Sequence, residues 1–459
     1  MAEHVNMTST GISWLPLLPS HWKTKKIKYS FNERSEKGFP KEPLLVASQN
    51  MGVVPKNVYG KRTVEALKDL DKLKLVRLGD YVISLRSFQG GIEYAYYQGI
   101  ISPAYTILKS TKDFTSAYYK YLFKSKPFIG LLTTCVTGIR EGQNIDYGRL
   151  KNQYIPVPPR AEQDQIVRFL DWKISEINKL IGIRKKEIQE LEKLQKVIID
   201  KSISLGINTD VEYKKTNVFY LSKIPAHWEL MKLKNVCKLG ASIKDQLKDF
   251  NEDDKVVLLP MEKITTKGDI DCSIKEPIKK VKSGFSSFSR GDVIVAKITP
   301  CFENGKGACL DKLETKIGYG TTELFNLRSN NKVLPEYLYY ITMTRLFRDL
   351  GTRRMTGAAG QKRVPATFIK NFMIGIPPLQ EQRQILEYIH KETKKIDELI
   401  NIRIKQCETL LEYKKVIISD VVTGKIDVRH IPIPEYEHVA DADVDSSDDA
   451  EREAEERRE

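Results

Sequence analysis

The feature that most constrains how this chain folds is a 47-residue segment that occurs twice. Residues 155–201 read IPVPPRAEQDQIVRFLDWKISEINKLIGIRKKEIQELEKLQKVIIDK, and residues 374–420 read IGIPPLQEQRQILEYIHKETKKIDELINIRIKQCETLLEYKKVIISD. The copies lie 219 positions apart and align without a gap, with Pro-Pro, Glu-Gln and several isoleucines at matching positions. Because an internal repeat marks a structural unit that is used again, we expect two related halves.

Each copy of the segment predicts one long helix. Consecutive prolines lack backbone donors and force extended conformations, so the first helix should begin between residues 160 and 163. Gly206 and Gly424 are plausible helix ends. Between these limits the positions at coiled-coil spacing are mostly apolar. They are Ile177, Ile181, Arg184, Ile188, Leu191, Gln195 and Ile198 in the first helix, and Ile396, Ile400, Arg403, Cys407, Leu410, Lys414, Ile417 and Val421 in the second.

A helix with a long apolar stripe needs a partner, and the second copy supplies one. We therefore predict an α/β (α+β) fold in which two globular domains are joined by two long antiparallel helices that form an intramolecular coiled coil with pseudo-two-fold symmetry. Two alternatives stay open, namely helices packed on their own domains and helices used for dimerisation. The predicted segments are 1–155 (first globular domain), 156–206 (first helix), 207–374 (second globular domain), 375–424 (second helix) and 425–459 (C-terminal segment).

The regions ahead of the two helices read as globular, with strands and helices mixed. Each opens on Pro-x-His-Trp, at Pro19–Trp22 and again at Pro225–Trp228, which we interpret as a structural turn and not as a ligand site. A Gly-Asp pair precedes a strand in each half. Strands are expected at 44–47, 74–76, 81–85, 104–108, 256–259, 293–298 and 323–327, and helices at 114–123, 126–132 and 334–351.

The charge of the chain indicates what kind of molecule it binds. The chain of 459 residues has a formal net charge of +15, although residues 441–459 hold ten acidic residues and three arginines. That tail carries −7 and reads as solvated and disordered, which leaves +22 on the remainder. A body this basic favours a polyanion, most simply nucleic acid. Without an apolar run of ~20 residues or a signal peptide, we expect a cytoplasmic protein whose six scattered cysteines are reduced thiols.

The sequence offers few of the groups that enzymes need. It contains no phosphate-binding Gly-x-x-x-x-Gly-Lys-Ser/Thr loop, no dinucleotide fingerprint and no Asn/Asp-Pro-Pro-Tyr/Phe stretch. Its six histidines are not paired at metal-ligand spacing. We therefore predict a non-catalytic protein with no catalytic, cofactor-binding or metal site of its own.

Binding to DNA is the function that remains, through basic and amide side chains on glycine-containing loops of both halves. Arg and Lys suit guanine edges and phosphates, while Asn and Gln can bond adenine in the major groove. The candidates in the first half are Arg86, Ser87, Gln89, Arg140 and Gln143. Those in the second half are Lys297, Asn304, Lys306, Arg353, Arg354, Gln361, Lys362 and Arg363.

The order of these motifs resembles one known family. Pro-x-His-Trp, a variable half, PPRAEQ and a long helix are followed by Pro-x-His-Trp, a second variable half, PPLQEQ, a second helix and the closing VVTGKIDVR at 421–429. This pattern is similar to the specificity subunit of type I restriction–modification systems, and it covers nearly the whole chain except the leader and the acidic tail.

The resemblance implies the following organisation. Each variable half would be a target recognition domain that reads one half of a bipartite, asymmetric site in double-stranded DNA. The coiled coil would set the spacing and dock two modification (methyltransferase) subunits, joined by two restriction (translocase and nuclease) subunits. S-adenosylmethionine, ATP and Mg²⁺ would be bound by those partners and not by this chain. The alternatives are a self-contained DNA-modifying enzyme and a coiled-coil scaffold that binds proteins only.

Overall fold

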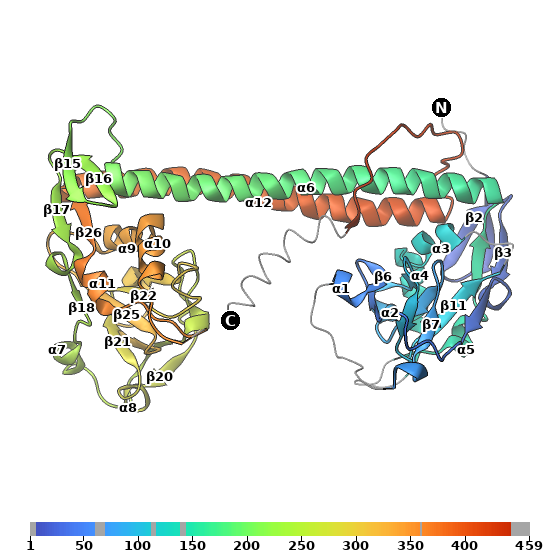
Figure 1. Cartoon of the computed structure of the whole chain (residues 1–459), viewed down its shortest axis with the longest axis horizontal. Coiled ribbons are helices and arrows are strands. Elements are labelled where there is room, and N and C mark those ends of the chain that lie inside the picture. The colour runs from blue at the N-terminus through green and yellow to red at the C-terminus, as the bar shows by residue number, and fades with distance from the viewer. Residues whose placement is uncertain (1–5, 60–68, 112–115, 138–143, 359, 442–459) are drawn as a thin grey trace. The chain divides into compact units, whose positions relative to one another are not determined.

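The computed structural model describes residues 6–59, 69–111, 116–137, 144–358 and 360–441 (Figure 1). The chain divides into two compact units. The first unit comprises Met1–Lys185 with Ile404–Asp449, and the second unit comprises Lys186–Arg403 with Ala450–Glu459. Each long helix therefore contributes one half to each unit, whereas the domain boundaries predicted from the sequence set each helix apart as a segment of its own.

The two repeated segments form the long helices α6 (Arg160–Leu205) and α12 (Leu379–Val422), each continuous in Figure 1. Both begin directly after a Pro-Pro pair, as predicted, because the prolines cannot join the helical hydrogen-bond ladder. Gly206 and Gly424 follow the helix ends with φ of 79° and 72°. At Gly424 a Cβ atom would lie 2.3 Å from Cγ of Pro19, so both the conformation and the space favour glycine.

The predicted coiled coil is confirmed within each unit. In the first unit the N-terminal half of α6 packs on the C-terminal half of α12, with Ile177, Ile181, Ile417 and Val421 buried in one cluster. In the second unit the C-terminal half of α6 and the N-terminal half of α12 share another cluster, to which Ile203 belongs. The start of one helix thus meets the end of the other, which is antiparallel pairing.

Polar seam positions pair across the helices in a repeated pattern. In the second unit Gln195 Nε2 donates to Asp397 Oδ1 at 3.1 Å. In the first unit Lys414 Nζ donates to Asn178 Oδ1, also at 3.1 Å. Gln195 and Lys414 occupy equivalent places 219 residues apart, as do Asn178 and Asp397, so one cross-helix contact has been built twice with different side chains.

The globular part of the first unit is built on a four-stranded antiparallel sheet in the order β4–β11–β8–β9. Shorter strand pairs and small helices surround it. Its strands are β1 (Met7–Ile12), β2 (Leu15–Pro19), β3 (Lys23–Lys26), β4 (Phe31–Arg34), β5 (Leu45–Ser48), β6 (Gly52–Pro55), β7 (Lys74–Val76), β8 (Tyr81–Ile83), β9 (Glu93–Tyr94), β10 (Gly99–Ile101), β11 (Thr106–Ser110), β12 (Val136–Thr137), β13 (Asn144–Ile145) and β14 (Tyr154–Val157). Its shorter helices are α1 (Lys56–Tyr59), α2 (Ser87–Gly90), α3 (Ser116–Leu122), α4 (Lys126–Thr134) and α5 (Tyr147–Leu150).

The second unit repeats that sheet as β18–β25–β22–β23 and adds the sheet β20–β19–β24–β21, in which β19 and β24 are parallel. Its strands are β15 (Tyr213–Val218), β16 (Leu221–Pro225), β17 (Glu229–Lys232), β18 (Cys237–Leu239), β19 (Lys255–Leu259), β20 (Lys275–Pro277), β21 (Ser286–Ser289), β22 (Val293–Ala296), β23 (Gly307–Cys309), β24 (Ile317–Gly320), β25 (Leu324–Ser329) and β26 (Met373–Ile376). Its shorter helices are α7 (Lys244–Leu247), α8 (Ile278–Val281), α9 (Pro335–Met343), α10 (Arg345–Arg353) and α11 (Ala366–Asn371).

The predicted strands correspond to β5, β7, β8, β11, β19, β22 and β25, with ends that differ by up to two residues. The prediction of one helix over 334–351 is wrong, because the chain breaks at Thr344, whose ψ of 140° is extended. The Thr344 hydroxyl accepts a hydrogen bond from the Phe347 amide and so begins a new helix, α10. The break makes a helix pair, α9–α10, that matches α3–α4 of the first unit.

Each Gly-Asp turn places a buried aspartate directly before a strand of the four-stranded sheet, β8 or β22. The buried Asp80 carboxylate accepts from Arg34 Nε at 2.7 Å in the first unit. The buried Asp292 carboxylate accepts from Arg328 Nε at 2.7 Å in the second. The two arginines come from strands at different places in their sheets, β4 and β25. The aspartate is therefore the member of this buried pair that has the same position in both units.

The helix pairs attach each globular part to the end of a long helix. Tyr118 of α3 donates its hydroxyl to the Val422 carbonyl at 2.6 Å. Tyr337 of α9 donates to the Ile203 carbonyl at 3.2 Å. Donors and acceptors are both related by the 219-residue offset, so the structural repeat extends beyond the segment that is obvious in the sequence.

The two Pro-x-His-Trp turns bind the first turns of the long helices. His21 Nε2 lies 2.8 Å from Glu162 Oε2, and His227 Nε2 lies 2.7 Å from Glu381 Oε2. In the second unit the buried Trp228 indole also donates to Glu381 Oε1 at 3.0 Å. The Glu of the Glu-Gln motif is thus the residue that joins each turn to its helix, in agreement with a structural role for the turn.

Beyond α12, the chain packs back along the first unit. Gln165 Nε2 donates to the carbonyls of Val428 and Ile431, at 3.0 and 2.9 Å. Asp441 accepts from Asn178 at 2.8 Å and pairs with Lys414. The prediction of a solvated tail is therefore wrong for Asp441, because these two donors hold it, while residues 442–459 lie outside the described part of the chain.

Candidate nucleic-acid interface

In the second unit the structure brings the two predicted loops together. The loop that follows β22 runs beside the loop that follows α10, because Thr299 N donates to Lys362 O at 2.9 Å and Val364 N donates to Lys297 O at 2.8 Å. Residues 297–306 and 353–363, which are distant in the sequence, therefore form one surface. This adjacency was not predicted.

Most candidate side chains on that surface are accessible. Arg353, Arg354, Gln361 and Lys362 are exposed, while Lys297, Asn304 and Lys306 are half-buried. Arg363 is 44% exposed and forms two hydrogen bonds to the Glu323 carboxylate, at 2.8 and 2.9 Å. These bonds hold the pKa of Glu323 below its usual value. In this conformation the guanidinium of Arg363 is therefore bound to a protein carboxylate.

In the first unit the candidates lie on and beside α2. Arg86 and Gln89 are exposed. Ser87 is fully buried, and its hydroxyl accepts a hydrogen bond from the Ser84 amide at 2.8 Å. In the described conformation Ser87 therefore shapes the turn and has no surface to offer a base, which differs from the role expected for it.

The remaining first-half candidates, Arg140 and Gln143, lie outside the described residues. They belong to the connection between β12 and β13, and β13 contacts α2. The flanks of that connection therefore lie beside Arg86 and Gln89, much as the two loops of the second unit lie together.

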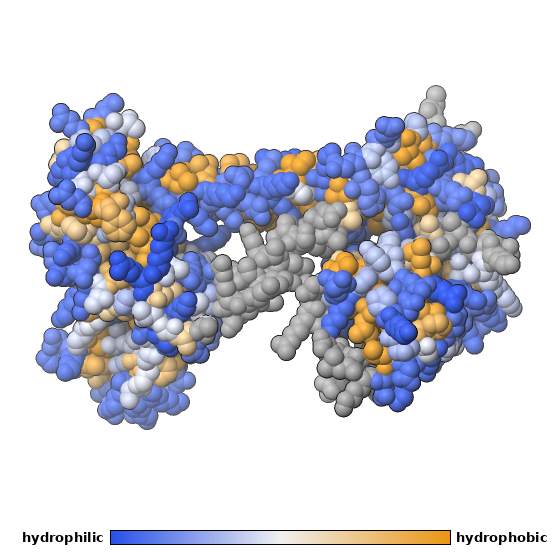
Figure 2. Space-filling view, in the orientation of Figure 1, coloured by the Kyte–Doolittle hydropathy of each residue, from blue (hydrophilic) through white to orange (hydrophobic). Residues whose placement is uncertain are grey.

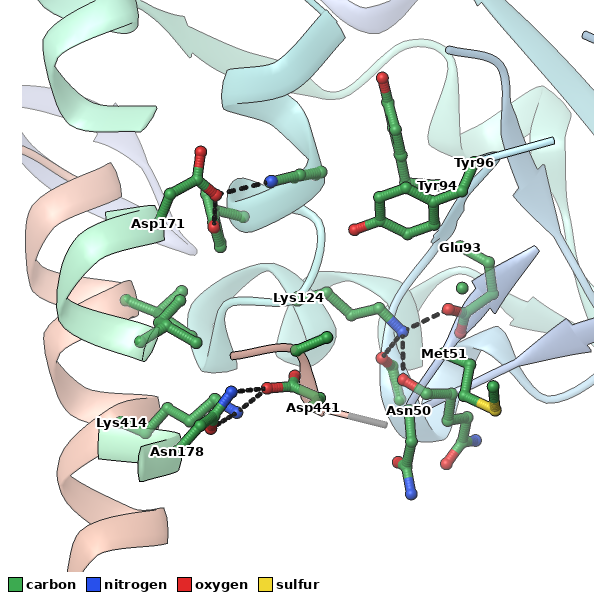
Figure 3. Close-up of a pocket in the computed structure, with 18 of the residues that line it drawn as sticks. Asn50, Met51, Glu93, Tyr94, Tyr96, Lys124, Asp171, Asn178, Lys414 and Asp441 are labelled. Carbon is green, nitrogen blue, oxygen red and sulfur yellow. Dashed lines mark hydrogen bonds and ion pairs between the residues drawn. The ribbon is translucent and has the colours of Figure 1, made fainter. Parts of the chain in front are cut away.

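A cavity of about 940 Å³ lies next to α2 (Figure 3). Its walls come from the β5–β6 turn, α2, the α3–α4 pair, α6, α12 and residues 438–441, all in the first unit. Lys124 projects into it and donates its ammonium to Gln49 O and Gly90 O, both at 3.0 Å, and to Glu93 Oε2 at 2.6 Å. Glu93 is 1% exposed, and this burial raises its pKa to about 7, against the opposing effect of Lys124.

Other charged side chains of the cavity are also paired within the protein. Asp171 of α6 accepts from Lys120 Nζ at 2.8 Å and from the Tyr121 hydroxyl. Figure 3 shows the Asn178–Lys414–Asp441 cluster on the same helical wall. These pairs neutralise each other, so the arrangement fits a role in holding loops and helices together better than a role in acid–base chemistry. Sequence reasoning missed Glu93 and Lys124, because neither stands in a recognisable spacing.

The described residues contain neither a metal-ligand cluster nor a membrane-spanning helix. Within that part of the chain no three His, Cys, Asp or Glu residues are grouped so that they could hold a metal ion. None of the helices described there is both long and apolar enough to span a membrane.

Similar proteins were found by sequence and by structure. The family described as "Type I restriction modification DNA specificity domain" matches twice, over residues 19–193 and 225–408. The EcoAI and EcoEI type I restriction enzyme specificity subunits of Escherichia coli are 40% and 35% identical, over 169 and 168 residues. Those alignments cover 36% of this chain, and only 28% and 27% of the respective relatives.

Longer matches have lower identity. The MjaVIII type I restriction enzyme specificity subunit of Methanocaldococcus jannaschii is 27% identical over 379 residues, which are 80% of this chain and 83% of the relative. One chain of a solved structure, described as "Structural basis underlying complex assembly and conformational transition of the type I R-M system", shares the fold. Its TM-score is 0.61 at 14% identity, over 89% of this chain and 99% of that one. With the family matched in both halves, the chain belongs to the type I restriction modification DNA specificity domain family.

Proposed function

We propose that this chain is the DNA-specificity subunit of a type I restriction–modification complex, and that each unit reads one part of a bipartite, asymmetric target. The observation that carries this proposal is the contrast between framework and loops. The two units repeat their coiled coil, Pro-x-His-Trp turns, Gly-Asp turns and helix pairs, yet they carry different side chains in the loops that follow β8 and β22. Two units with the same framework and different loops are suited to recognising two different DNA sequences.

The accessible loop side chains have the chemistry for reading bases. Arg86 and Gln89 would serve in the first unit, with Arg140 and Gln143 as further predicted readers. Arg and Lys recognise guanine edges and phosphates, and Asn and Gln recognise adenine. In the second unit we propose the cluster Lys297, Asn304, Lys306, Arg353, Arg354, Gln361 and Lys362, with Arg363 available when it leaves Glu323.

The coiled coil offers matched surfaces for two copies of one partner. Eight apolar residues, each 42–53% exposed, occupy two heptad positions on one flank of the seam, and Figure 2 shows hydrophobic side chains at the surface of the long helices. Exposed apolar side chains gathered in this way indicate a protein-binding surface. Each unit has an equivalent set under the 219-residue offset. The sets are Leu180, Ile183, Tyr413 and Val416 in the first unit, and Leu399, Ile402, Leu194 and Val197 in the second.

We propose that these two sets dock two methyltransferase subunits, and that two restriction subunits complete the complex. In this proposal the chain recognises DNA and is not itself catalytic. S-adenosylmethionine, ATP and Mg²⁺ would be bound by the partners. The family match supports this division of labour, because the matching family is described as a DNA specificity domain.

Adenine methylation mapped across genomic DNA tests the proposal. Three kinds of cell would be compared. All carry the methyltransferase subunit, together with this chain, without it, or with a variant of it in which Arg353 and Arg354 are both changed to Ala. We expect one bipartite motif that requires this chain and loses fidelity in one part in the variant. Methylation of the same sites without the chain, or turnover by the purified chain alone with S-adenosylmethionine, would contradict the proposed role.

A further inference from the structure

In the first unit a single lysine connects the helix pair α3–α4 to the proposed reading loop. Lys124 stands in the turn between the two helices, and its ammonium donates to the carbonyls of Gln49 and Gly90, each at 3.0 Å. Gly90 follows Gln89 directly. Figure 3 shows the same ammonium directed at Glu93, which supplies the counter-charge. The three acceptors come from the β5–β6 turn, α2 and β9, so one cation ties three segments together.

In the second unit a single arginine makes the corresponding connection. Arg348 of α10 donates to the Phe302 carbonyl at 2.9 Å and to the Gly305 carbonyl at 3.4 Å. These two carbonyls flank Glu303 and Asn304 in the loop after β22. That loop occupies the same place in its sheet as the α2 loop does in the first unit, since β22 matches β8 in strand order.

The helix pair and the loop are in close contact at a glycine in each unit. A Cβ atom on Gly91, whose φ is +88°, would lie 2.2 Å from the Phe123 carbonyl, so the loop rests against the α3–α4 turn. In the second unit a Cβ atom on Gly351 of α10 would lie 2.3 Å from the Phe302 ring. The glycine is on the loop in one unit and on the helix in the other, yet the same two elements meet.

The environment of Arg348 indicates that its role is to position the loop backbone and not to stabilise the fold. It is 7% exposed, and among the described residues no carboxylate lies within ion-pair distance of it. Carbonyl dipoles and the faces of Phe302 and Phe347, at 4.8 and 6.0 Å, surround the guanidinium instead. Its Nε has no hydrogen-bond partner in the part of the chain that the structure describes. Burying a charge in this way is costly, so a well-packed apolar side chain would serve stability better.

The same helix pairs are anchored to the coiled coil through Tyr118 and Tyr337, which donate to carbonyls at the ends of α12 and α6. A path of direct contacts therefore runs from the end of a long helix, through the helix pair and its cation, to the loop. Each unit has its own path, which ends in a lysine in the first unit and in an arginine in the second.

We propose that Lys124 and Arg348 are positioning residues for target recognition, each holding the backbone of one reading loop so that its base-contacting side chains keep a fixed direction. This inference rests on the proposed function and adds residues that need not touch DNA. Without the cation, the carbonyls next to Gln89 and on either side of Asn304 would lose their side-chain donor, while the Phe302 carbonyl would keep its bond from the Gly305 amide. The loop, held only by its own backbone bonds, would sample other conformations. Discrimination between bases would then fall in the half-site that the unit reads.

The test uses the full chain assembled with its methyltransferase subunits and a DNA library randomised one half-site at a time. Lys124→Met is expected to lower discrimination against wrong bases about tenfold in one half-site, and Arg348→Met in the other, since a mismatch typically changes binding by one to two orders of magnitude. Lys124→Arg and Arg348→Lys keep a cationic donor and should restore most of that discrimination. Lys120→Met and Arg345→Met are matched controls, because their side chains pair with Asp171 and Asp349 and not with the loops.

Hydrogen exchange of the same complexes separates the proposal from a general loss of structure. We expect faster exchange at residues 49–52 and 86–91 in Lys124→Met, and at 300–306 in Arg348→Met, with the coiled coil unchanged. A wild-type complex that reads no bipartite target would overturn the proposed function. A wild-type complex that reads one, together with Met variants that keep full discrimination in both halves or lose it equally in both, would overturn the positioning role.

Discussion

At the scale of single residues, this chain places several ionisable side chains inside the protein. Glu93 is almost fully buried beside Lys124, Asp80 and Asp292 each accept from an arginine, and Arg348 is surrounded by carbonyls. Such groups contribute unevenly to stability, because desolvation opposes the attraction between partners. Their effects should appear in the dependence of stability on pH and in single substitutions.

Glu93 should make the first unit less stable as pH rises. Burial raises its pKa from 4.5 to about 7 in the folded chain, so the protonated form is favoured by folding. The stabilisation is complete below about pH 4.5 and is lost as pH rises through 7, by an amount on the order of 3 kcal/mol. Denaturant unfolding between pH 4.5 and 8 should show this decline in wild type and not in Glu93→Gln. Parallel curves for the two proteins would contradict it, and Glu412→Gln, at an exposed position, serves as the control.

Glu381 and Glu162 occupy equivalent positions, but their removal should not cost the same. Glu381→Ala leaves the buried Trp228 indole nitrogen without its acceptor, which costs about 1–3 kcal/mol. Glu162→Ala removes the contact to His21 and leaves the indole nitrogen of Trp22 unaffected, since that nitrogen has no hydrogen-bond partner among the described residues. Equilibrium unfolding of the two variants measures the difference. Equal destabilisation would show that the indole bond contributes nothing.

At the scale of secondary-structure elements, the framework was predictable and the reading surface was not. A gapless repeat with heptad spacing and Pro-Pro starts determines α6 and α12, because each signal depends only on neighbouring residues. The strands after the Gly-Asp pairs followed for the same reason. By contrast, the contact between the loops that follow β22 and α10 depends on tertiary packing, which no local pattern encodes. The break at Thr344 has a local signal, its capping hydroxyl, which the helical periodicity of residues 334–351 hid.

The positioning cations show why sites are harder to predict than elements. By the 219-residue offset Lys124 aligns with Met343, and Arg348 aligns with Ile129. The two units therefore hold their loops with cations at positions that do not align. An alignment of the two repeats does not show that these two residues are equivalent. Ser87 shows the opposite case, since its neighbours in the sequence suggested a reader while the fold buries its hydroxyl.

The exposed apolar sets on the coiled coil should determine how many partner subunits bind. Leu180→Glu and Leu399→Glu each place a charge in one of the two equivalent surfaces, at side chains that are 44% and 42% exposed. Because the positions face solvent, the fold should persist while one partner copy is lost in each single variant and both in the double variant. Native mass spectrometry of the reconstituted complex counts the copies. Lys193→Glu, on the outer face of α6, is the control, and two bound copies in both single variants would contradict the assignment.

At the scale of the whole molecule, the length of the long helices should control the gap between the two DNA words. One heptad added to both helices, after Lys186 and after Lys405, lengthens each by about 10 Å. At 3.4 Å per base pair this corresponds to about three base pairs. Methylation mapping should then find the same two half-site sequences with a gap longer by about that number. Altered half-sites, or an unchanged gap, would show that the helices do not set the spacing.

In the proposed function the two units read two different parts of one DNA target. The most direct measurement is the methylation motif produced by chains in which residues 207–374 have been replaced by residues 1–155, so that the second unit carries the loops of the first. If each unit reads its own half-site, the motif should have two parts with the same sequence in inverted orientation, and the original gap should be kept. A motif that stays asymmetric, or one that is continuous without a gap, would contradict it.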